Sequence, residues 1–268
     1  MTLKIELTDW QGSHRTPGNP SVVGGVPEVW LGLEGEHRAR YRFARNYVKS
    51  KAVLDAGCGN GYGSVSLLKA GAKSVVGLDI SEEAVNEAKS HYAAPNLHYQ
   101  VGDLHKLPFA TDSFDIVVAF EIIEQVPEFE QVLHEFQRVL KPGGLLLIST
   151  LNRAVISGHE GPSNPYLRRE FSPRELETML AGYFKLPFDI FGQFPAQDYS
   201  AKETFHIPTI TESLTPMHDP QQDVRVPNNN SNNGFVQNVR HTYTNEQDYV
   251  FVRDRLEEAP VLVAVCRR

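Results

Sequence analysis

The chain has 268 residues, of which 41% are hydrophobic and 22% charged, and its formal net charge is −7. This length and composition fit one large folded domain and exclude an intrinsically disordered protein. The acidic excess disfavours nucleic acid as a partner, because binding to phosphate backbones needs a net basic surface. No apolar run reaches the length of a membrane span, and the N-terminus does not resemble a signal peptide. The sequence therefore predicts a soluble, cytoplasmic protein.

Residues 1–33 are predicted to form an irregular N-terminal arm, because Gly, Pro, Ser and Asn are frequent between Gln11 and Pro27. From Glu34 to Lys49 apolar residues recur at helical spacing, which predicts an amphipathic helix. Residues 34–268 are predicted to form a single domain. The two cysteines, Cys58 and Cys266, lie far apart and indicate neither a disulfide framework nor a zinc site.

Apolar runs alternate with helix-length amphipathic segments through the middle of the chain. This alternation predicts an α/β fold with right-handed crossovers and a mostly parallel sheet. The seven expected strands are Ala52–Ala56, Ser74–Ile80, Leu97–Val101, Phe114–Phe120, Leu145–Thr150, Phe184–Phe191 and Val261–Cys266. The polar stretch 192–260 interrupts the alternation and predicts a long insertion, or lid, before the last strand.

Local signals mark the ends of the helices between these strands. Ser81 is placed to cap a helix that begins directly after a strand. Ser172 precedes a proline and is followed three residues later by Glu175, which predicts a capping box. Pro127 suits a helix start, and the run Lys141–Gly144 suits a helix end.

A glycine-rich loop follows the first strand, in the run Asp55-Ala-Gly57-Cys-Gly59-Asn-Gly61. Glycines let the backbone turn sharply and let a ligand approach where a Cβ would clash, while the next helix presents its N-terminal amides. The spacing fits the dinucleotide fingerprint poorly, since counting from Gly57 puts Tyr62 where the third glycine should stand.

Acidic residues stand at the ends of the next two strands. Asp79 ends the second strand, where a carboxylate can accept hydrogen bonds from both hydroxyls of a ribose. Asp103 follows the third strand, where it can accept from the amine of adenine while Leu104 packs against the ring. Together with Asp55 and one glycine loop, these positions predict a site for an adenosyl ligand.

These motifs resemble the class I S-adenosylmethionine-dependent methyltransferases over residues 34–150. The runs that carry the resemblance are Val53–Gly61, Gly77–Ile80, Gly102–Asp103, Leu107–Phe109, Ser113–Ile116 and Arg138–Gly144. The resemblance implies a Rossmann-like three-layer sandwich with a seven-stranded, mostly parallel sheet whose last strand is antiparallel. It also implies S-adenosyl-L-methionine as the cofactor and S-adenosyl-L-homocysteine as its product.

The resemblance assigns roles to individual residues as well. Those expected to border the cofactor are Arg40, Asp55, Gly57, Gly59, Gly61, Asp79, Ile80, Asp103, Leu104, Phe120 and Glu121. Within this set, Asp55 and the glycines would border the methionine part, and Arg40 or Tyr41 would reach its carboxylate. The segments 36–41, 164–176 and 259–267 are similar to a subgroup associated with surface polysaccharide synthesis, which implies a sugar or nucleotide-sugar oxygen as acceptor.

One departure from the family concerns the proton of the acceptor. Many relatives that methylate oxygen carry Glu-x-x-Glu-His after the fourth strand, where the histidine serves as a base or, with the glutamates, as a metal ligand. This chain reads Glu121-Ile-Ile-Glu124-Gln125, and an amide accepts no proton at working pH. We therefore expect no metal here, and either a natural-product nitrogen as acceptor or a base supplied elsewhere. The candidate catalytic residues are Gln125, His159 and His206.

Two other functions remain open. A nicotinamide-dependent oxidoreductase would use the same glycine loop and Asp79, although the glycine spacing and Asp103 disfavour it. A non-catalytic binding protein could also use this fold. The sequence favours methyl transfer to a small molecule or sugar, with no nucleic acid or membrane partner, and leaves the acceptor and the oligomeric state open.

Overall fold

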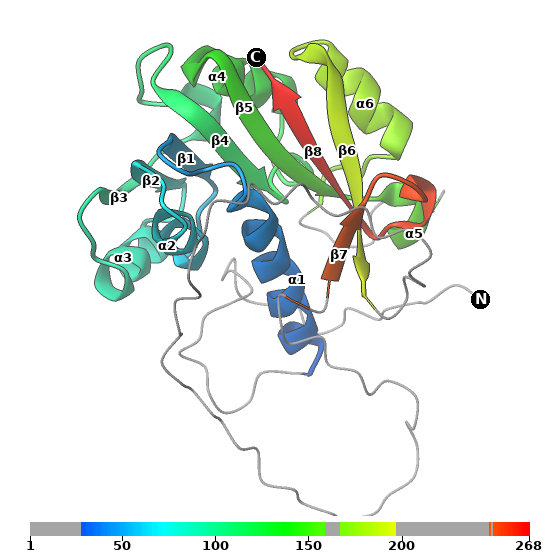
Figure 1. The fold of residues 1–268 in the computed structure, drawn as a ribbon, viewed down its shortest axis with the longest axis horizontal. Coiled ribbons are helices and arrows are strands. Elements are labelled where there is room, and N and C mark those ends of the chain that lie inside the picture. Colours follow the sequence, from blue (N-terminus) through cyan, green and yellow to red (C-terminus); the bar gives the residue numbers. More distant parts are fainter. Residues whose placement is uncertain (1–27, 159–166, 197–246, 248) are drawn as a thin grey trace, which may run out of the picture.

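The computed structural model describes residues 28–158, 167–196, 247 and 249–268 (Figure 1). The helices, including two short 3-10 helices labelled η, are α1 (Glu28–Ala44), α2 (Tyr62–Lys69), α3 (Glu82–His91), η1 (Leu104–Lys106), α4 (Phe129–Val139), α5 (Arg153–Ile156), α6 (Pro173–Ala181) and η3 (Leu256–Glu258). The strands are β1 (Ala52–Ala56), β2 (Ser74–Asp79), β3 (Leu97–Val101), β4 (Phe114–Phe120), β5 (Leu140–Leu151), β6 (Lys185–Pro195), β7 (Tyr249–Val252) and β8 (Val261–Arg267).

In the described part of the chain, eight strands form one sheet in the order β3-β2-β1-β4-β5-β8-β6-β7. Strands β1 to β5 pair in parallel, whereas β8 runs antiparallel to both β5 and β6. This confirms the α/β class and the antiparallel last strand. The expected number of seven strands is wrong, because β7 adds an antiparallel edge beside β6. β7 and the end of β6 belong to the stretch 192–260 that the sequence assigned to an insertion.

The strands whose observed ends match the predicted ends are short strands with turn residues on both sides. β1, β3 and β4 have the expected bounds, and β8 extends one residue further than expected. β5 begins earlier than expected, because the chain after α4 is already extended and Leu140 pairs with Phe114. α1 begins at Glu28, so the described end of the predicted arm is helical. Both predicted serine caps are present, with the full capping box at Ser172.

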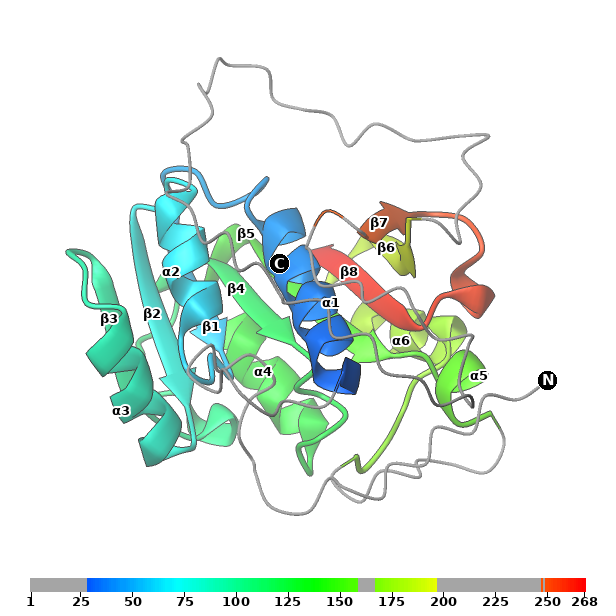
Figure 2. The same ribbon diagram turned by 90° about the horizontal axis from the view of Figure 1, so that it is seen from below.

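Helices cover both faces of the sheet and make three layers (Figures 1 and 2). One buried cluster joins α1, α2 and α3 to one face, through residues such as Phe43 and Leu67 packed around Val53. The other joins α4 and α6 to the opposite face, where Phe136 packs in the same cluster as Leu54. Val53 and Leu54 are neighbours in β1, so the alternation of a strand divides the core between the two faces. None of the described helices has the length and apolar character needed to cross a membrane.

Candidate active site

The predicted cofactor residues meet at one edge of the sheet. β1, β2, β3 and β4 are parallel neighbours, so their carboxyl ends lie side by side. The glycine loop follows β1, Asp79 ends β2, Asp103 follows β3 and Glu121 follows β4. Ligands of open α/β sheets bind outside this edge, where the order of the strands reverses. The reversal here falls between β1 and β4.

The glycine loop has a backbone that other residues fit poorly. Gly57, Gly59 and Gly61 have φ angles of 74°, 52° and 86°, in the left-handed region that favours glycine. A Cβ on Gly57 would lie 2.1 Å from Cδ1 of Ile122. A Cβ on Gly61 would lie 2.7 Å from the hydroxyl oxygen of Tyr99. The loop therefore packs closely on its protein neighbours while it leads into the N-terminus of α2.

Asp55 lies in β1, two residues before the first glycine of this loop. Its carboxylate is buried and accepts hydrogen bonds from the Tyr41 hydroxyl at 3.0 Å and from Ser64 Oγ at 2.6 Å. Burial raises the pKa of Asp55 to about 6, although these two hydrogen bonds lower it. Asp55 thus connects α1, β1 and α2.

Asp79 joins the glycine loop to α3. One carboxylate oxygen accepts from the amide of Gly59 at 2.9 Å, and the other accepts from the amide of Ser81 at 2.9 Å. A carboxylate can accept about four hydrogen bonds, so acceptor capacity remains on both oxygens. Ile80, beside it, is 75% exposed. An acidic group held at a strand end with free lone pairs fits the hydroxyls of a ribose.

Asp103 and His105 form a linked pair after β3. Asp103 Oδ1 lies 2.9 Å from the His105 amide and 2.7 Å from His105 Nδ1, while Nε2 of the same ring lies 2.7 Å from the carbonyl of Pro127. That carbonyl and the Asp103 carboxylate raise the pKa of His105. Leu104 is buried, whereas the side chain of Asp103 is 55% exposed. Asp103 therefore caps the short helix η1 and still faces solvent.

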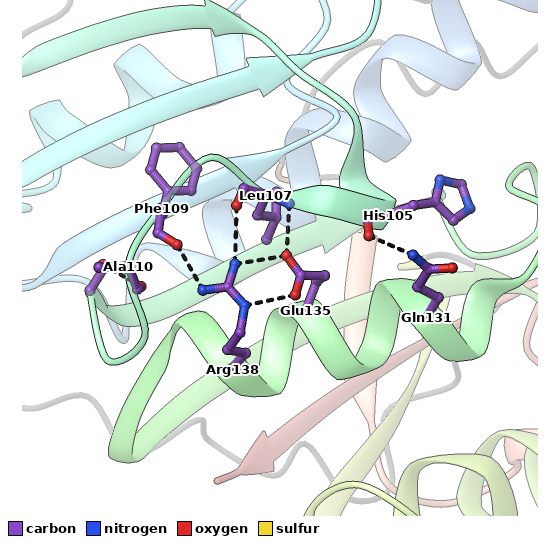
Figure 3. A network of polar contacts seen from close by, with 8 residues as sticks. His105, Leu107, Phe109, Ala110, Gln131, Glu135 and Arg138 are labelled. Carbon is purple, nitrogen blue, oxygen red and sulfur yellow. Dashed lines mark hydrogen bonds and ion pairs between the residues drawn. The ribbon is translucent and has the colours of Figure 1, made fainter.

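Helix α4 holds the loop after β3 in place (Figure 3). Arg138 donates to the carbonyls of Leu107 and Phe109, at 3.0 and 2.7 Å, and also forms a bidentate pair with Glu135. Glu135 in turn accepts from the Leu107 amide at 2.7 Å. Charge-assisted bonds of this kind are stronger than neutral ones. Arg138, the first residue of the motif Arg138–Gly144, thus binds the backbone of the motif Leu107–Phe109 directly.

Arg40 and Glu121 form the ionic centre of the site. Arg40 is fully buried; its Nη2 lies 2.6 Å from Glu121 Oε1, and its Nη1 donates to Gln193 Oε1 at 2.8 Å. His37 Nε2 lies 3.1 Å from the other oxygen of Glu121. Burial raises the pKa of Glu121, but Arg40 and His37 outweigh it and lower the pKa. With Tyr41 bound to Asp55, the expected contact of Arg40 or Tyr41 with a cofactor carboxylate stays a prediction.

The candidate catalytic residues are placed unevenly. Gln125 is exposed, and its side-chain amide donates to the carbonyl of Glu121 at 2.6 Å. His159 and His206 lie outside the described residues. Among the residues that the structure describes, no three His, Cys, Asp or Glu side chains gather closely enough to hold a metal ion.

Sequence reasoning missed three contributors to this edge of the sheet. Glu124 belongs to the motif after β4 and is completely buried there. Phe120 was not missed, since it was expected to border the cofactor; it is nearly buried and packs edge-on against Tyr41. His37 and Gln193 hold the Arg40–Glu121 pair. The position of Glu124 in the motif was the available signal for it, whereas no pattern in the sequence pointed to Gln193.

Residues 54–148 match a family described as a methyltransferase domain. A probable S-adenosylmethionine-dependent methyltransferase of Mycolicibacterium smegmatis is 38% identical over 145 residues, which cover 54% of this chain and 55% of that relative. A ubiquinone biosynthesis O-methyltransferase of Coxiella burnetii is 38% identical over 118 residues, which cover 43% of this chain and 50% of that relative. The matched part of the chain spans about half the length of these two curated relatives.

The fold is also similar to that of a solved structure from Thermotoga maritima, an S-adenosylmethionine-dependent methyltransferase described as a possible histamine N-methyltransferase. The TM-score is 0.59 at 16% identity, and the alignment covers 88% of this chain and 90% of that one. At this identity the likeness concerns the fold alone. Since the sequence relatives, the matched domain and the edge that gathers the cofactor motifs agree, residues 54–148 belong to the methyltransferase domain family, and the relatives they match are S-adenosylmethionine-dependent.

Proposed function

We propose that this protein is an enzyme that transfers a methyl group from S-adenosylmethionine to a small-molecule acceptor. The acceptor atom would be a sugar or nucleotide-sugar oxygen or a natural-product nitrogen. The observation that carries the proposal is Asp79, which binds the glycine loop and the start of α3 and keeps acceptor capacity for a ribose. The O-methyltransferase among the relatives favours oxygen, whereas Gln125 favours nitrogen unless another group takes the proton.

The protein residues would bind and orient the two substrates. The glycine loop would lie along the methionine part, Asp79 would bind the ribose, and Asp103 with Leu104 would bind the adenine. When bound, the cofactor supplies a sulfonium methyl group that is already electrophilic. The enzyme then needs to align the acceptor atom, the methyl carbon and the sulfur and to exclude water. Arg138 would contribute to binding indirectly, because it holds the loop after β3, which includes Asp103 and Leu104.

A thermal-shift experiment with two ligands tests this proposal. S-adenosylhomocysteine is expected to raise the melting temperature, because a ligand at 100 times its Kd adds about 2.7 kcal/mol to the free energy of unfolding. NAD is expected to have no effect. Stabilisation by NAD alone would point to the oxidoreductase, and stabilisation by neither ligand would point to a non-catalytic protein on this fold.

Titration calorimetry of Asp79→Asn locates the ligand. The substitution replaces a charged acceptor by a neutral amide, and hydrogen bonds to charged groups contribute about 1.5–3 kcal/mol. We expect the Kd for S-adenosylhomocysteine to rise by at least about tenfold. Glu82→Gln is the matched control, because Glu82 is an exposed carboxylate in the first turn of α3. Equal affinities of the two variants would contradict the role of Asp79.

A further inference from the structure

His105 lies between two hydrogen-bond acceptors. Its ring Nδ1 lies 2.7 Å from Asp103 Oδ1, and its Nε2 lies 2.7 Å from the carbonyl oxygen of Pro127. A carbonyl oxygen only accepts hydrogen bonds. The backbone amide and the ring of His105 lower the pKa of Asp103, so this carboxylate is ionised at neutral pH and also only accepts. Both ring nitrogens therefore face groups that need a donor.

This geometry favours one protonation state of the ring. A neutral imidazole has one N–H, so it can donate to Asp103 or to Pro127 but not to both, whereas an imidazolium donates to both at once. The charged groups that act on the ring favour the same form, since Asp103 precedes it and Glu128 lies at the start of α4. The Pro127 carbonyl and then these two carboxylates raise the pKa of His105, although partial burial opposes them.

Helix α4 holds the backbone around His105. The carbonyl of His105 accepts from Gln131 Nε2 at 2.9 Å (Figure 3). The Leu107 amide donates to Glu135, the other acid of α4 that contacts this loop, and Glu135 is already paired with Arg138. These contacts do not involve the ring. A change of charge on His105 therefore acts on the contacts with Asp103 and Pro127, which together are called the His105 bridge below.

The His105 bridge joins two loops on either side of the cofactor edge. Asp103 follows β3, whereas Pro127 lies in the segment that follows β4. In the sheet, β2 and β1 lie between these two strands and carry Asp79 and the glycine loop at their ends. Ile122, in the segment after β4, packs directly on Gly57 of that loop. The bridge thus connects the expected adenine end of the site to the segment beside the expected methionine end.

We infer that His105 is a positioning residue for the methyl donor, and that its imidazolium form holds Asp103 and the segment after β4 in the arrangement that binds the adenosyl group. This inference rests on the proposed binding of adenine by Asp103 and Leu104. His105 contacts Asp103 only through Oδ1, and the Asp103 side chain is 55% exposed, so acceptor capacity remains for the adenine amine.

The sign of the pH effect follows from the two acceptors. When the ring loses a proton, one nitrogen presents a lone pair to an acceptor, and that half of the His105 bridge is lost. Affinity for the adenosyl ligand should therefore fall as the pH rises through the pKa of His105. By reciprocity, binding of the ligand should raise this pKa further.

Two substitutions each keep one half of the bridge. His105→Asn keeps a donor at about the position of Nδ1, and His105→Gln keeps one at about the position of Nε2. Titration calorimetry with S-adenosylhomocysteine compares both variants with the wild type from about pH 6 to about pH 9, a range that extends upward from the ordinary pKa of histidine. At the low end both variants should bind about two- to tenfold more weakly, the effect of about one hydrogen bond. The difference should shrink as the pH rises, because the wild type then loses a contact too.

His98→Gln is the matched control. His98 is an exposed histidine of β3, the strand that leads to Asp103, and it is not part of the bridge. This variant should keep the Kd for S-adenosylhomocysteine within about twofold of the wild type at each pH. A loss of affinity in His105→Asn and His105→Gln that stays constant with pH would show that the size of the His105 ring matters and not its charge, and would overturn the inference.

NMR titration of the histidine side chains measures the charge of the ring directly. The His105 signal is identified by its absence in His105→Gln. In the protein without ligand it should titrate above the ordinary pKa of histidine, and S-adenosylhomocysteine should move its pKa further upward. An ordinary or lowered pKa would overturn the inference, and so would a pKa that the ligand leaves unchanged.

Failure of this inference and failure of the proposed function give different results. If the wild type and the His105 variants bind S-adenosylhomocysteine equally well at about pH 6, the methyl donor is bound but His105 does not position it. If the wild type binds no S-adenosylhomocysteine at any pH, methyl transfer is rejected and this role of His105 with it. The NMR titration without ligand then decides whether the ring is an imidazolium that joins the two loops.

Discussion

Asp55 links the sequence motif to the stability of the molecule. Asp55 is the acidic residue of β1 that precedes the glycine loop, and the hydroxyl groups of Tyr41 in α1 and Ser64 in α2 donate hydrogen bonds to its carboxylate. Burial makes its ionisation costlier in the folded chain than in the unfolded chain, so its pKa rises from 3.8 to about 6. At neutral pH the ionised, buried Asp55 therefore lowers the free energy of unfolding, while its hydrogen bonds hold α1 and α2 beside the loop.

The cost predicts how stability changes with pH. A pKa raised in the folded state gives stability that is complete below the unfolded pKa and is lost as pH rises through the folded pKa. Asp55→Asn keeps acceptor and donor groups for Tyr41 and Ser64 but does not titrate. Between about pH 4 and about pH 8 the wild type should lose about 3 kcal/mol relative to this variant, since one pKa unit corresponds to about 1.4 kcal/mol. Urea unfolding at each pH measures the difference, and a difference independent of pH would contradict the prediction.

The sequence was enough to place a residue at the site where its position relative to a predicted strand determined where it lies. Asp79 and the three glycines could be assigned because each stands at the end of a strand or in the loop after it. Arg40 could be placed near the site, but its pairing with Glu121 and Gln193 depends on how α1 lies across the sheet. Gln125 was weighed for its chemistry, although its side chain is exposed and it is the neighbour Glu124 that is buried.

At the scale of elements, the turn from β1 into α2 depends on glycine for two separate reasons. Gly61 has a φ of 86°, and a Cβ there would also meet Tyr99 and Ala88 at 2.7 and 2.8 Å. Gly143, at the start of β5, has a similar φ of 79°, but a Cβ there would meet nothing within 4 Å. Comparing the two positions therefore separates the energetic cost of backbone strain from that of steric crowding.

Alanine substitutions at these two glycines should therefore differ. Gly143→Ala should cost about 1 kcal/mol, the typical strain of a left-handed non-glycine residue. Gly61→Ala should cost about 1–3 kcal/mol more, because overpacking adds to the strain. Chemical unfolding of both variants gives the comparison, and Gly61→Ala should also weaken binding of S-adenosylhomocysteine. Equal free energies of unfolding would show that Tyr99 moves away at no cost.

The elements themselves were predictable where apolar runs lie between clear turn residues, as at β1, β3 and β4. β7 was not predicted, because a four-residue edge strand after a long polar stretch has too little pattern to separate it from a loop. The early start of α1 was missed for a related reason, since glycine and proline nearby indicated an irregular arm. Pairing with β6 gives β7 its structure, and this partner is remote in sequence.

At the scale of the whole molecule, Gln193 joins regions that the family match does not include. It lies in β6, accepts from Arg40 at 2.8 Å and donates to the carbonyl of Glu36 at 2.9 Å. Both partners belong to α1, more than 150 residues earlier in the chain. The matched residues 54–148 contain neither α1 nor β6. The buried amide of Gln193 thus helps to connect the N-terminal helix to the antiparallel part of the sheet, beside the hydrogen bond from Arg42 to the Tyr249 carbonyl in β7.

Gln193→Ala should loosen α1 and, through it, the active site. The substitution removes a hydrogen bond to a buried charge, which contributes about 1.5–3 kcal/mol, and also the bond to the Glu36 carbonyl. It leaves Arg40 paired with Glu121. Hydrogen exchange in α1 should accelerate more than exchange in α4, because α4 packs on the other face of the sheet. Gln131→Ala is the control, because Gln131 makes one exposed bond to the carbonyl of His105. If exchange in α1 is the same in both variants, the helix is held by its apolar face and not by Gln193.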